Sequence, residues 1–250
     1  MALPQVGVFG LGAFGQLMVR HLAPYCQILA YDPSPAALRF ARRHAVTLAS
    51  LETVAACQYV ILAAPVIRLK ALSEAIAPHV RKGAIILDVG SVKVAPAQWM
   101  QDALPDNVDI ICTHPLFGPQ SGRTGIHGLE IVLCPVRATR LMRIRRFLEQ
   151  ALGLKVSVTS PEEHDQALAA VQGLTHLIAK VLSGMEPLPR TLTTRSYDLL
   201  MQGVGLVQGD SDELFLAIER DNPYARAVRQ RFFAEIAALE TRLTPEGHGG

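Results

Sequence analysis

The sequence predicts an α/β fold in which a doubly wound, mostly parallel sheet is followed by a smaller all-helical domain. Three observations predict it. From residue 5 to about residue 158, short apolar runs alternate with segments of helical periodicity, which is the pattern of βαβ units. Runs such as Ala84-Ile-Ile-Leu-Asp88 do not alternate in polarity, as expected of strands buried on both faces of a parallel sheet. After Thr159-Ser160-Pro161 the strand signals stop and only helical periods follow.

The expected elements follow directly from these patterns. The predicted strands are Val6–Phe9, Ile28–Tyr31, Tyr59–Ala63, Ala84–Val89, Val108–Cys112, Glu130–Cys134 and Lys155–Val158. The predicted helices between them are Ala13–Leu22, Pro35–Arg43, Val66–Ala77 and Ala138–Ala151. Beyond the sheet, helices are expected at about 161–185, 195–206, 211–220 and 223–243. Ser160 is a suitable N-cap for the first of these, with Pro161 at its first position.

The domain boundary is therefore expected near residue 160. Residues 1–159 are expected to form the α/β domain, residues 160–243 a helical domain, and residues 244–250 a frayed tail.

The composition predicts a folded chain without a nucleic-acid partner. The 250 residues suffice for one large or two ordinary domains. They are 50% hydrophobic and carry 24 basic against 22 acidic side chains, a formal charge of +2, which excludes a disordered chain. Basic residues are dispersed except in segment 140–146, which we expect to be the solvated face of a helix; nucleic-acid binding needs a basic face.

Apolar runs and cysteines predict a cytoplasmic protein. The longest apolar run, residues 59–67, is far shorter than the ~20 residues of a membrane helix, so no membrane partner is expected. We also expect no secretory signal before the first strand. The cysteines stand singly without C-x-x-C spacing, which predicts reduced packing residues, with no metal site and no disulfide framework: Cys26, Cys57, Cys112 and Cys134.

A glycine motif at the first strand predicts a dinucleotide site. The segment Gly10-Leu-Gly12-Ala-Phe-Gly15 follows that strand and opens the first helix. In this motif the first glycine allows the tight turn, the second lets the backbone approach a pyrophosphate at the helix N-terminus, and the third allows close packing of helix and strand. Asp32 lies 20 residues after Gly12, at the end of the second strand, where a carboxylate binds ribose hydroxyls and repels a 2′-phosphate. NAD is therefore expected as cofactor and NADP is disfavoured, so residues 1–159 are expected to be a nucleotide-binding domain of the Rossmann type.

The rest of the candidate cofactor set lies beside this motif: Ala13, Phe14, Ala64 and Pro65. Arginines at 39, 42 and 43 follow Asp32 and keep NADP open, and a glycine turn with an Asx turn at Asp32-Pro33 is the alternative without a ligand.

Polar side chains after two neighbouring strands predict the reacting centre. Ser91 and Lys93 follow one strand, and His114 follows the next. Ligands of doubly wound sheets bind outside the carboxyl ends of the strands, so Ser91 and His114 are expected to hydrogen-bond to each other or to one substrate atom. A neutral imidazole there can accept an alcohol proton while hydride leaves the same carbon. Taken singly, Ser91 can instead cap a helix starting near Lys93, His114 can be a loop histidine, and Lys93 a solvated side chain.

The first helix of the second domain adds a polar stripe. Asp165, Gln172, His176 and Lys180 share one helical face. Asp165 and His176 are separated by about 16 Å of helical rise, so we place Gln172, Thr175 and His176 at the substrate and leave Asp165 open. A purely structural helix with a polar stripe is the alternative.

Together these segments resemble the prephenate/arogenate dehydrogenase family of tyrosine biosynthesis. The matching segments are Gly10–Gly15, Asp88-Val-Gly-Ser-Val-Lys93, Thr113-His-Pro-Leu-Phe-Gly-Pro-Gln-Ser-Gly122, Glu163-His-Asp-Gln166 and Gln172-Gly-Leu-Thr-His176. The resemblance implies oxidative decarboxylation of a cyclohexadienol, with His114 as proton acceptor, Ser91 bonded to the hydroxyl, Lys93 supporting the loop or a carboxylate, and Gln120 and His176 at the substrate.

One departure from the family concerns the substrate. Prephenate-preferring members carry a late arginine for a substrate carboxylate, and the matching stretch here, Gly203-Val-Gly205-Leu206, lacks it. The segments Cys112–Gly122 and Tyr197–Leu200 resemble the arogenate-preferring plant type. The resemblance thus favours arogenate over prephenate, with Arg123, Arg190 or Arg195 as replacements for the missing cation.

Two other functions share the same domain plan. An imine reductase or β-hydroxyacid dehydrogenase would differ in the segments after the strands at 84–89 and 108–112. A non-catalytic NAD-sensing protein would bind NAD without turnover. The last helix carries an apolar stripe formed by Val228, Phe232, Ile236, Leu239 and Leu243. This stripe can pack on helix 161–185 alone, but we expect it also to pack on a second copy and form a homodimer.

Overall fold

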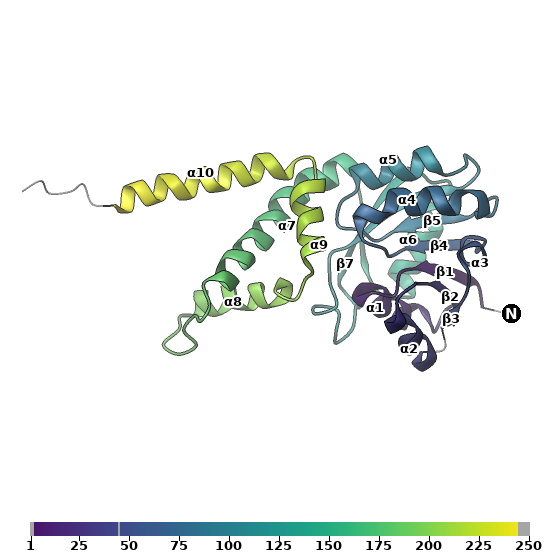
Figure 1. The fold of residues 1–250 in the computed structure, drawn as a ribbon, viewed down its shortest axis with the longest axis horizontal. Coiled ribbons are helices and arrows are strands. Elements are labelled where there is room, and N and C mark those ends of the chain that lie inside the picture. The colour runs from purple at the N-terminus through teal and green to yellow at the C-terminus, as the bar shows by residue number, and fades with distance from the viewer. Residues whose placement is uncertain (1–2, 45, 245–250) are drawn as a thin grey trace, which may run out of the picture.

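The protein consists of a sheet covered by helices on both faces and a helical domain that extends to one side of it (Figure 1). The computed structural model describes residues 3–44 and 46–244. The predicted tail 244–250 lies outside the described residues, except for Thr244.

The sheet has eight strands in the order β3-β2-β1-β4-β5-β6-β7-β8. All neighbouring pairs are parallel except β6 and β7, so β7 and β8 run against the other six. The strands are β1 (Gln5–Phe9), β2 (Gln27–Tyr31), β3 (Thr47–Leu48), β4 (Tyr59–Leu62), β5 (Ile85–Asp88), β6 (Asp109–Pro115), β7 (Glu130–Arg137) and β8 (Lys155–Val158). The predicted fold class is therefore confirmed. Among the described strands the sequence analysis missed the two-residue β3, and among the helices it did not list α3 (Leu51–Ala55) or α5 (Val94–Ala103).

Helices cover both faces of the sheet. One face packs against α3 (Leu51–Ala55), α4 (Val66–Ile76) and α5 (Val94–Ala103). The other packs against α1 (Ala13–Leu22), α2 (Pro35–Arg43) and α6 (Leu141–Gln150). A 3-10 turn, η1 (Ala77–His79), follows α4. Every residue of β5 and β6 is buried, which explains why these strands do not alternate in polarity.

Strand β6 continues three residues beyond its predicted end at Cys112. Its antiparallel pairing with β7 extends through Thr113, His114 and Pro115, which lie opposite Leu133, Val132 and Ile131. The interpretation of His114 as a loop residue is therefore wrong, because His114 lies on a strand and its backbone pairs with Val132 of β7.

The basic segment 140–146 is not a purely solvated face. Arg140 donates to Asp109 Oδ2 (3.0 Å) and to the carbonyls of Gly83 and Ala84, so it fastens the start of α6 to the sheet. The guanidinium of Arg143 lies 5.6 Å from the centre of the Tyr59 ring, a cation–π distance.

The helical domain begins at α7 (Pro161–Gly184) with a capping box, in which Ser160 accepts from the amide of Glu163 and the Glu163 carboxylate accepts in return. It continues with α8 (Arg195–Val207), α9 (Asp212–Leu216), the π-helical turn η2 (Ala217–Asp221) and α10 (Ala225–Leu243). The single helix expected over 211–220 is thus an α-helix that widens into a π turn. In Figure 1 the outer part of α10 extends away from the other helices.

By length and composition, α7 is the one described helix that could cross a membrane. The longest apolar run did not reveal it, because polar residues interrupt the helix. Its contacts are with α5, α8, α10, η2 and β7, and His164, Asp165 and His176 are buried along it. One helix of this kind is weak evidence for a membrane span.

Candidate functional site

The three motif glycines occupy the turn from β1 to α1 for different reasons. Gly10 has φ +103°, and a Cβ there would lie 2.5 Å from the carbonyl oxygen of Ala63. A Cβ on Gly15 would lie 2.2 Å from the carbonyl oxygen of Gly10. A Cβ on Gly12 would meet nothing within 4 Å, so the space above this glycine is open. The turn therefore leaves room for a ligand at Gly12 only.

The N-terminus of α1 faces this open space without a side-chain cap. Its first residues, Ala13 and Phe14, present backbone N–H groups that can bind an anion such as a pyrophosphate. Ala64 and Pro65 follow β4 on the other side of Gly10, and Pro65 is the N-cap of α4. This edge of the sheet thus fits a dinucleotide.

Asp32 completes this edge at the end of β2. Its carboxylate accepts from the amide of Leu11 (2.6 Å) and from the amide of Ser34 (2.8 Å). Partial burial opposes ionisation, but these hydrogen bonds hold the pKa of Asp32 below its ordinary value, so the carboxylate is charged at neutral pH. The alternative of an Asx turn is present in the Ser34 contact, and the second carboxylate oxygen is tied to the glycine turn itself.

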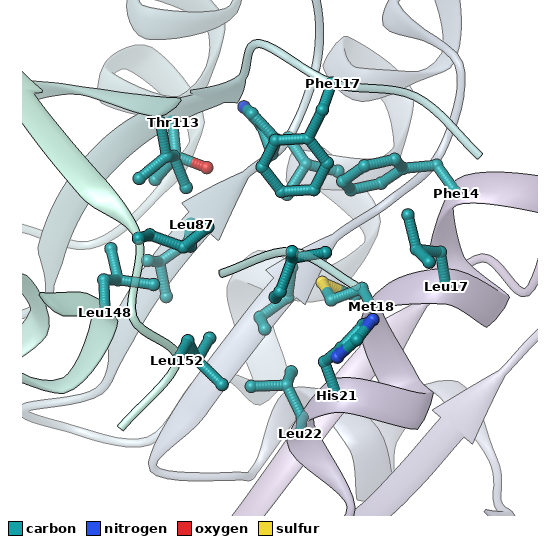
Figure 2. Close-up of a pocket in the computed structure, with 16 residues that line it drawn as sticks. Phe14, Leu17, Met18, His21, Leu22, Leu87, Thr113, Phe117, Leu148 and Leu152 are labelled. Carbon is teal, nitrogen blue, oxygen red and sulfur yellow. The ribbon is translucent and has the colours of Figure 1, made fainter. Parts of the chain in front are cut away.

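An apolar cavity of about 80 Å³ lies between α1, residues of the strands β4 to β7, and α6 (Figure 2). Figure 2 shows the rings of Phe14 and Phe117 side by side at its edge, tilted relative to each other, and their centres are 6.1 Å apart. His21 lines the cavity, and burial, followed by the charge of Arg20, lowers its pKa. Phe14 and Phe117 also line the next pocket, so they form the wall between the two.

That next pocket has a volume of about 390 Å³ and lies between the carboxyl ends of the strands and the helical domain. Its polar lining consists largely of side chains from β5–β6 and from α7–α9: Ser91, His114, Ser121, Gln172, Thr175, His176 and Asp210. The structure therefore brings together five of the predicted catalytic and substrate residues, which are Ser91, His114, Gln172, Thr175 and His176.

Ser91 is buried at this pocket, and its hydroxyl has no hydrogen-bond partner in the described part of the chain. The expected hydrogen bond to His114 is not present. Ser91 also does not cap α5, because the amides of Lys93 and Val94 donate to the carboxylate of Asp165 (2.8 and 2.9 Å). Burying a hydroxyl without a hydrogen-bond partner costs folding free energy. A ligand oxygen in the pocket could accept the hydrogen bond that the Ser91 hydroxyl does not make within the described chain.

Lys93 is neither solvated nor in the pocket. Its ammonium group is fully buried and donates to Asp88 Oδ2 (2.5 Å) and to the carbonyl oxygen of Thr113 (2.6 Å). Asp88 also accepts from the amides of Gly90 (2.8 Å) and Thr113 (3.3 Å). The interpretation of Lys93 as solvated is therefore wrong, and of its expected roles the geometry fits support of the loop after β5.

His114 is buried beside the pocket and bonds to a second histidine, His164, through its Nδ1 (2.9 Å). His164 in turn bonds through its own Nδ1 to Asp165 (2.7 Å). Burial, followed by the charges of His164 and Lys93, holds the pKa of His114 well below its ordinary value. The imidazole is therefore neutral at pH 7, the state in which it can accept a proton.

The polar residues that share one face of α7 make contacts in three different places. His176 bonds to the carbonyl of Gln172 (2.9 Å) and to Asp210 Oδ2 (3.1 Å), both at the pocket. Asp165 turns to the start of α5, and Lys180 pairs with Asp212 (2.6 Å) at the surface. A shared helical face thus did not mean a shared site.

Comparison with known proteins identifies the family. Residues 17–158 match the family described as prephenate dehydrogenase, nucleotide-binding domain. Arogenate dehydrogenase 2 of Arabidopsis thaliana is 32% identical over 96% of this chain and 70% of its own length. The chain belongs to the prephenate dehydrogenase family. The expected resemblance is therefore confirmed.

Two further relatives mark the range of this family. Arogenate dehydrogenase 1 of the same plant is 28% identical over 96% of this chain, which spans only 39% of that relative's length. The prephenate dehydrogenase of Aquifex aeolicus, in complex with hydroxyphenyl propionate and NAD+, has a TM-score of 0.73 at 18% identity. That alignment covers 97% of this chain and 92% of the other, and it shows the shared fold.

The segment that lacks the family's late arginine does reach the pocket. Leu206 lines it, and no lysine or arginine of the described ranges does. Arg190 lines a separate hollow at the α7–α8 loop, Arg195 is exposed at the start of α8, and Arg123 is exposed in the loop after β6. The three arginines proposed as replacement cations are therefore outside the pocket in this chain. Gln120 is also outside it, exposed beside Gly209.

Two site residues were not singled out from the sequence. His164 lies in the family segment Glu163-His-Asp-Gln166, but its partner on β6 is 50 residues earlier in the chain. Asp210 lies between two predicted helices, where an acidic residue is ordinary. For His164 the family segment was a signal, whereas for Asp210 no local signal existed.

Proposed function

We propose that this protein is an NAD-dependent arogenate dehydrogenase that forms tyrosine, with prephenate, giving 4-hydroxyphenylpyruvate, as the second substrate. The observation that carries the proposal is that a neutral, buried His114 and the Ser91 hydroxyl, which has no hydrogen-bond partner in the described chain, line one pocket beside the dinucleotide edge. Both relatives named above as arogenate dehydrogenases align over 96% of this chain.

The reaction requires the removal of a hydroxyl proton from the substrate in this pocket. His114 Nε2 takes the proton of the ring alcohol, and Ser91 donates to the same oxygen and orients it. When NAD is bound, it accepts the hydride that leaves the carbinol carbon. Loss of the ring carboxylate as carbon dioxide then makes the ring aromatic, so the overall step is irreversible. Gln172, Thr175 and His176 hold the remainder of the substrate.

Asp210 supports arogenate over prephenate. Arogenate carries an ammonium group on its side chain where prephenate carries a ketone. The Asp210 carboxylate lines the pocket and is oriented by His176, so it can accept from an ammonium group. The absence of arginine and lysine among the described lining residues favours the same substrate, because prephenate adds no positive charge of its own.

Asp32 supports NAD over NADP. Its carboxylate is ionised at the edge where the adenosine ribose would lie, and a 2′-phosphate would meet that charge. Arg42 and Arg43 stand in the last turn of α2, away from Asp32 at its start.

A single set of assays tests both choices. The values of kcat/KM are measured for arogenate and prephenate, each with NAD and with NADP. Arogenate with NAD is expected to give the highest value. A preference for prephenate of tenfold or more would overturn the substrate assignment, and turnover of neither substrate with intact NAD binding would leave a nucleotide-sensing protein.

We also propose that two copies pair through the C-terminal helices. On α10, Val228 and Phe232 are half-buried toward α7, whereas Ile236, Leu239 and Leu243 are 47%, 50% and 72% exposed. Val181 on α7 and Leu199 on α8 are further exposed apolar side chains of the helical domain. A second copy would cover this surface. Sedimentation of a 27.1 kDa species at micromolar concentration would reject the dimer.

A cytoplasmic location is proposed on the state of the cysteines. All four are free and buried. Burial raises the pKa of Cys26 to about 11 and that of Cys134 to about 12, so these thiols stay protonated and unreactive. Fractionation of the native host is the corresponding test, and recovery outside the cytoplasm would contradict it.

A further inference from the structure

A chain of three buried side chains runs from the pocket into the junction between the two domains. His114 Nδ1 lies 2.9 Å from His164 Nε2, and His164 Nδ1 lies 2.7 Å from Asp165 Oδ1. The three residues are 5%, 2% and 0% exposed. His114 belongs to β6 and the other two to the start of α7, so the chain joins the sheet to the helical domain.

The direction of each hydrogen bond follows from Asp165. Its two oxygens accept from the amides of Lys93 and Val94 at the N-terminus of α5, where the helix dipole stabilises an anion. A carboxylate in this position can only accept, so the hydrogen between it and His164 belongs to His164 Nδ1. A neutral His164 then has a lone pair on Nε2.

That lone pair determines the state of His114. It accepts a hydrogen from His114 Nδ1, and a neutral imidazole has only one N–H. The lone pair of His114 is therefore on Nε2. None of the described residues hydrogen-bonds to this atom, and the ring lines the same pocket as Ser91.

We infer that His164 and Asp165 are positioning residues that hold His114 in the tautomer with its hydrogen on Nδ1. This tautomer leaves Nε2 as the proton acceptor toward the pocket. When Nε2 takes a proton, His114 becomes an imidazolium, and the Asp165 carboxylate stabilises its charge through His164 without any proton leaving the relay. The tautomer is a property of the protein without substrate or cofactor, and only its consequence for turnover rests on the proposed function.

Other charged groups face His114 from each neighbouring element. Lys93 lies on the turn from β5 to α5 and is paired with Asp88 of β5. His176 of α7 is paired with Asp210 from the turn before α9. Lys93 and His176 oppose a positive charge on His114. Because both have partners of their own, Asp165 is the anion that His114 reaches through a hydrogen-bonded path.

The test reads the ring nitrogens of His114 directly. The full chain is labelled with ¹⁵N-histidine and examined by NMR at neutral pH without substrate or cofactor, and the His114 signals are identified by their loss in His114→Asn. We expect hydrogen on Nδ1 and none on Nε2. His164→Phe removes the acceptor and should shift His114 toward the opposite tautomer. His164→Gln keeps an acceptor oxygen and should preserve the native tautomer.

An exposed histidine provides the matched control. His79→Gln lies in η1, away from the pocket, and should leave the His114 signals and the kinetics unchanged. In the proposed reaction, His164→Phe should lower kcat at least tenfold with little change in KM, within the ~10²–10⁴-fold that a positioned base supplies. His164→Gln should recover part of the loss.

The outcomes separate the relay from the proposed function. Hydrogen on His114 Nε2 in the native chain, or an unchanged tautomer in His164→Phe, would overturn the relay even if arogenate is turned over. The expected tautomer in a chain that turns over neither cyclohexadienol would support the relay and refute the function. If His164→Phe does not fold, the native chain and His164→Gln decide the tautomer by themselves.

Discussion

Two buried polar clusters meet at the ends of β5 and β6, and they differ in whether they are closed. In the first, the side chains of Asp88 and Lys93 hydrogen-bond to each other and to nearby backbone groups. In the second, the path from Asp165 through His164 ends at His114, whose Nε2 has no partner among the residues described. The closed cluster fixes the geometry of the strand ends, and the open cluster presents one unpaired atom to a pocket.

The comparison teaches that burial and charge alone do not mark a reacting group. Lys93 and His114 are both buried and both polar, and each lies in a segment that matches the family. Lys93 does not line the pocket, whereas His114 and Ser91 do, and no hydrogen-bond partner is found for His114 Nε2 or the Ser91 hydroxyl in the described part of the chain. Substitutions in the open cluster should therefore change rates, whereas substitutions in the closed cluster should change stability.

The largest effect is expected in the open cluster. His114→Asn should lower kcat by about 10²–10⁴-fold, because it removes the proton acceptor. The affinity for NAD should stay nearly the same, since the dinucleotide edge lies at β1 and β2. Steady-state kinetics and NAD titration by fluorescence measure the two quantities, and near-normal turnover would refute the assignment of His114.

The closed cluster should show the reverse behaviour. Lys93→Met leaves the fully buried Asp88 carboxylate without its cation, which should cost about 3–5 kcal/mol of unfolding free energy. Urea denaturation measures the loss. The double variant Lys93→Met/Asp88→Leu should recover only part of it, because Asp88 also accepts from Gly90 and Thr113. A stable Lys93→Met with a kcat reduced as strongly as in His114→Asn would place Lys93 in the reaction instead.

A smaller effect should separate the two substrates. Asp210→Asn should lower kcat/KM for arogenate about tenfold, through loss of a charge-assisted hydrogen bond to the ammonium group. Prephenate should be affected less, because it lacks that group. Asp212→Asn is the matched control, since its carboxylate pairs with Lys180 at the surface. Equal losses for both substrates in Asp210→Asn would show that the residue does not discriminate between them.

The smallest effect concerns pH. The pKa of His114 is lowered in the folded chain, chiefly by burial, so below the unfolded value of 6.5 only the unfolded state gains this proton. The stability contribution is present above pH 6.5 and is lost as pH falls, by about 1 kcal/mol between pH 7 and 5.5. Denaturation at both pH values should show this loss in the native chain. His114→Asn should lack this component, and an unchanged pH dependence in that variant would contradict the assignment.

Much of the fold could be predicted because its causes are local. Strands such as β5 are apolar throughout since both faces are covered, and the Ser160-Pro161 pair starts α7 through its own backbone and side-chain groups. The boundaries failed where pairing decided them. Strand β6 reaches Pro115 because β7 lies beside it in the antiparallel direction, and no residue of β6 encodes that direction.

For the site, the sequence by itself determined the glycine turn, Asp32, Ser91 and His114, because the end of a strand is a fixed place in a doubly wound sheet. The tertiary structure alone decided the partners. Lys93 turns inward to Asp88, Asp165 caps α5 across 72 residues of sequence, and His164 meets His114 across 50. The physical reason is that hydrogen-bond partners of a buried polar group are set by the docking of α7 on the sheet, which no local periodicity contains.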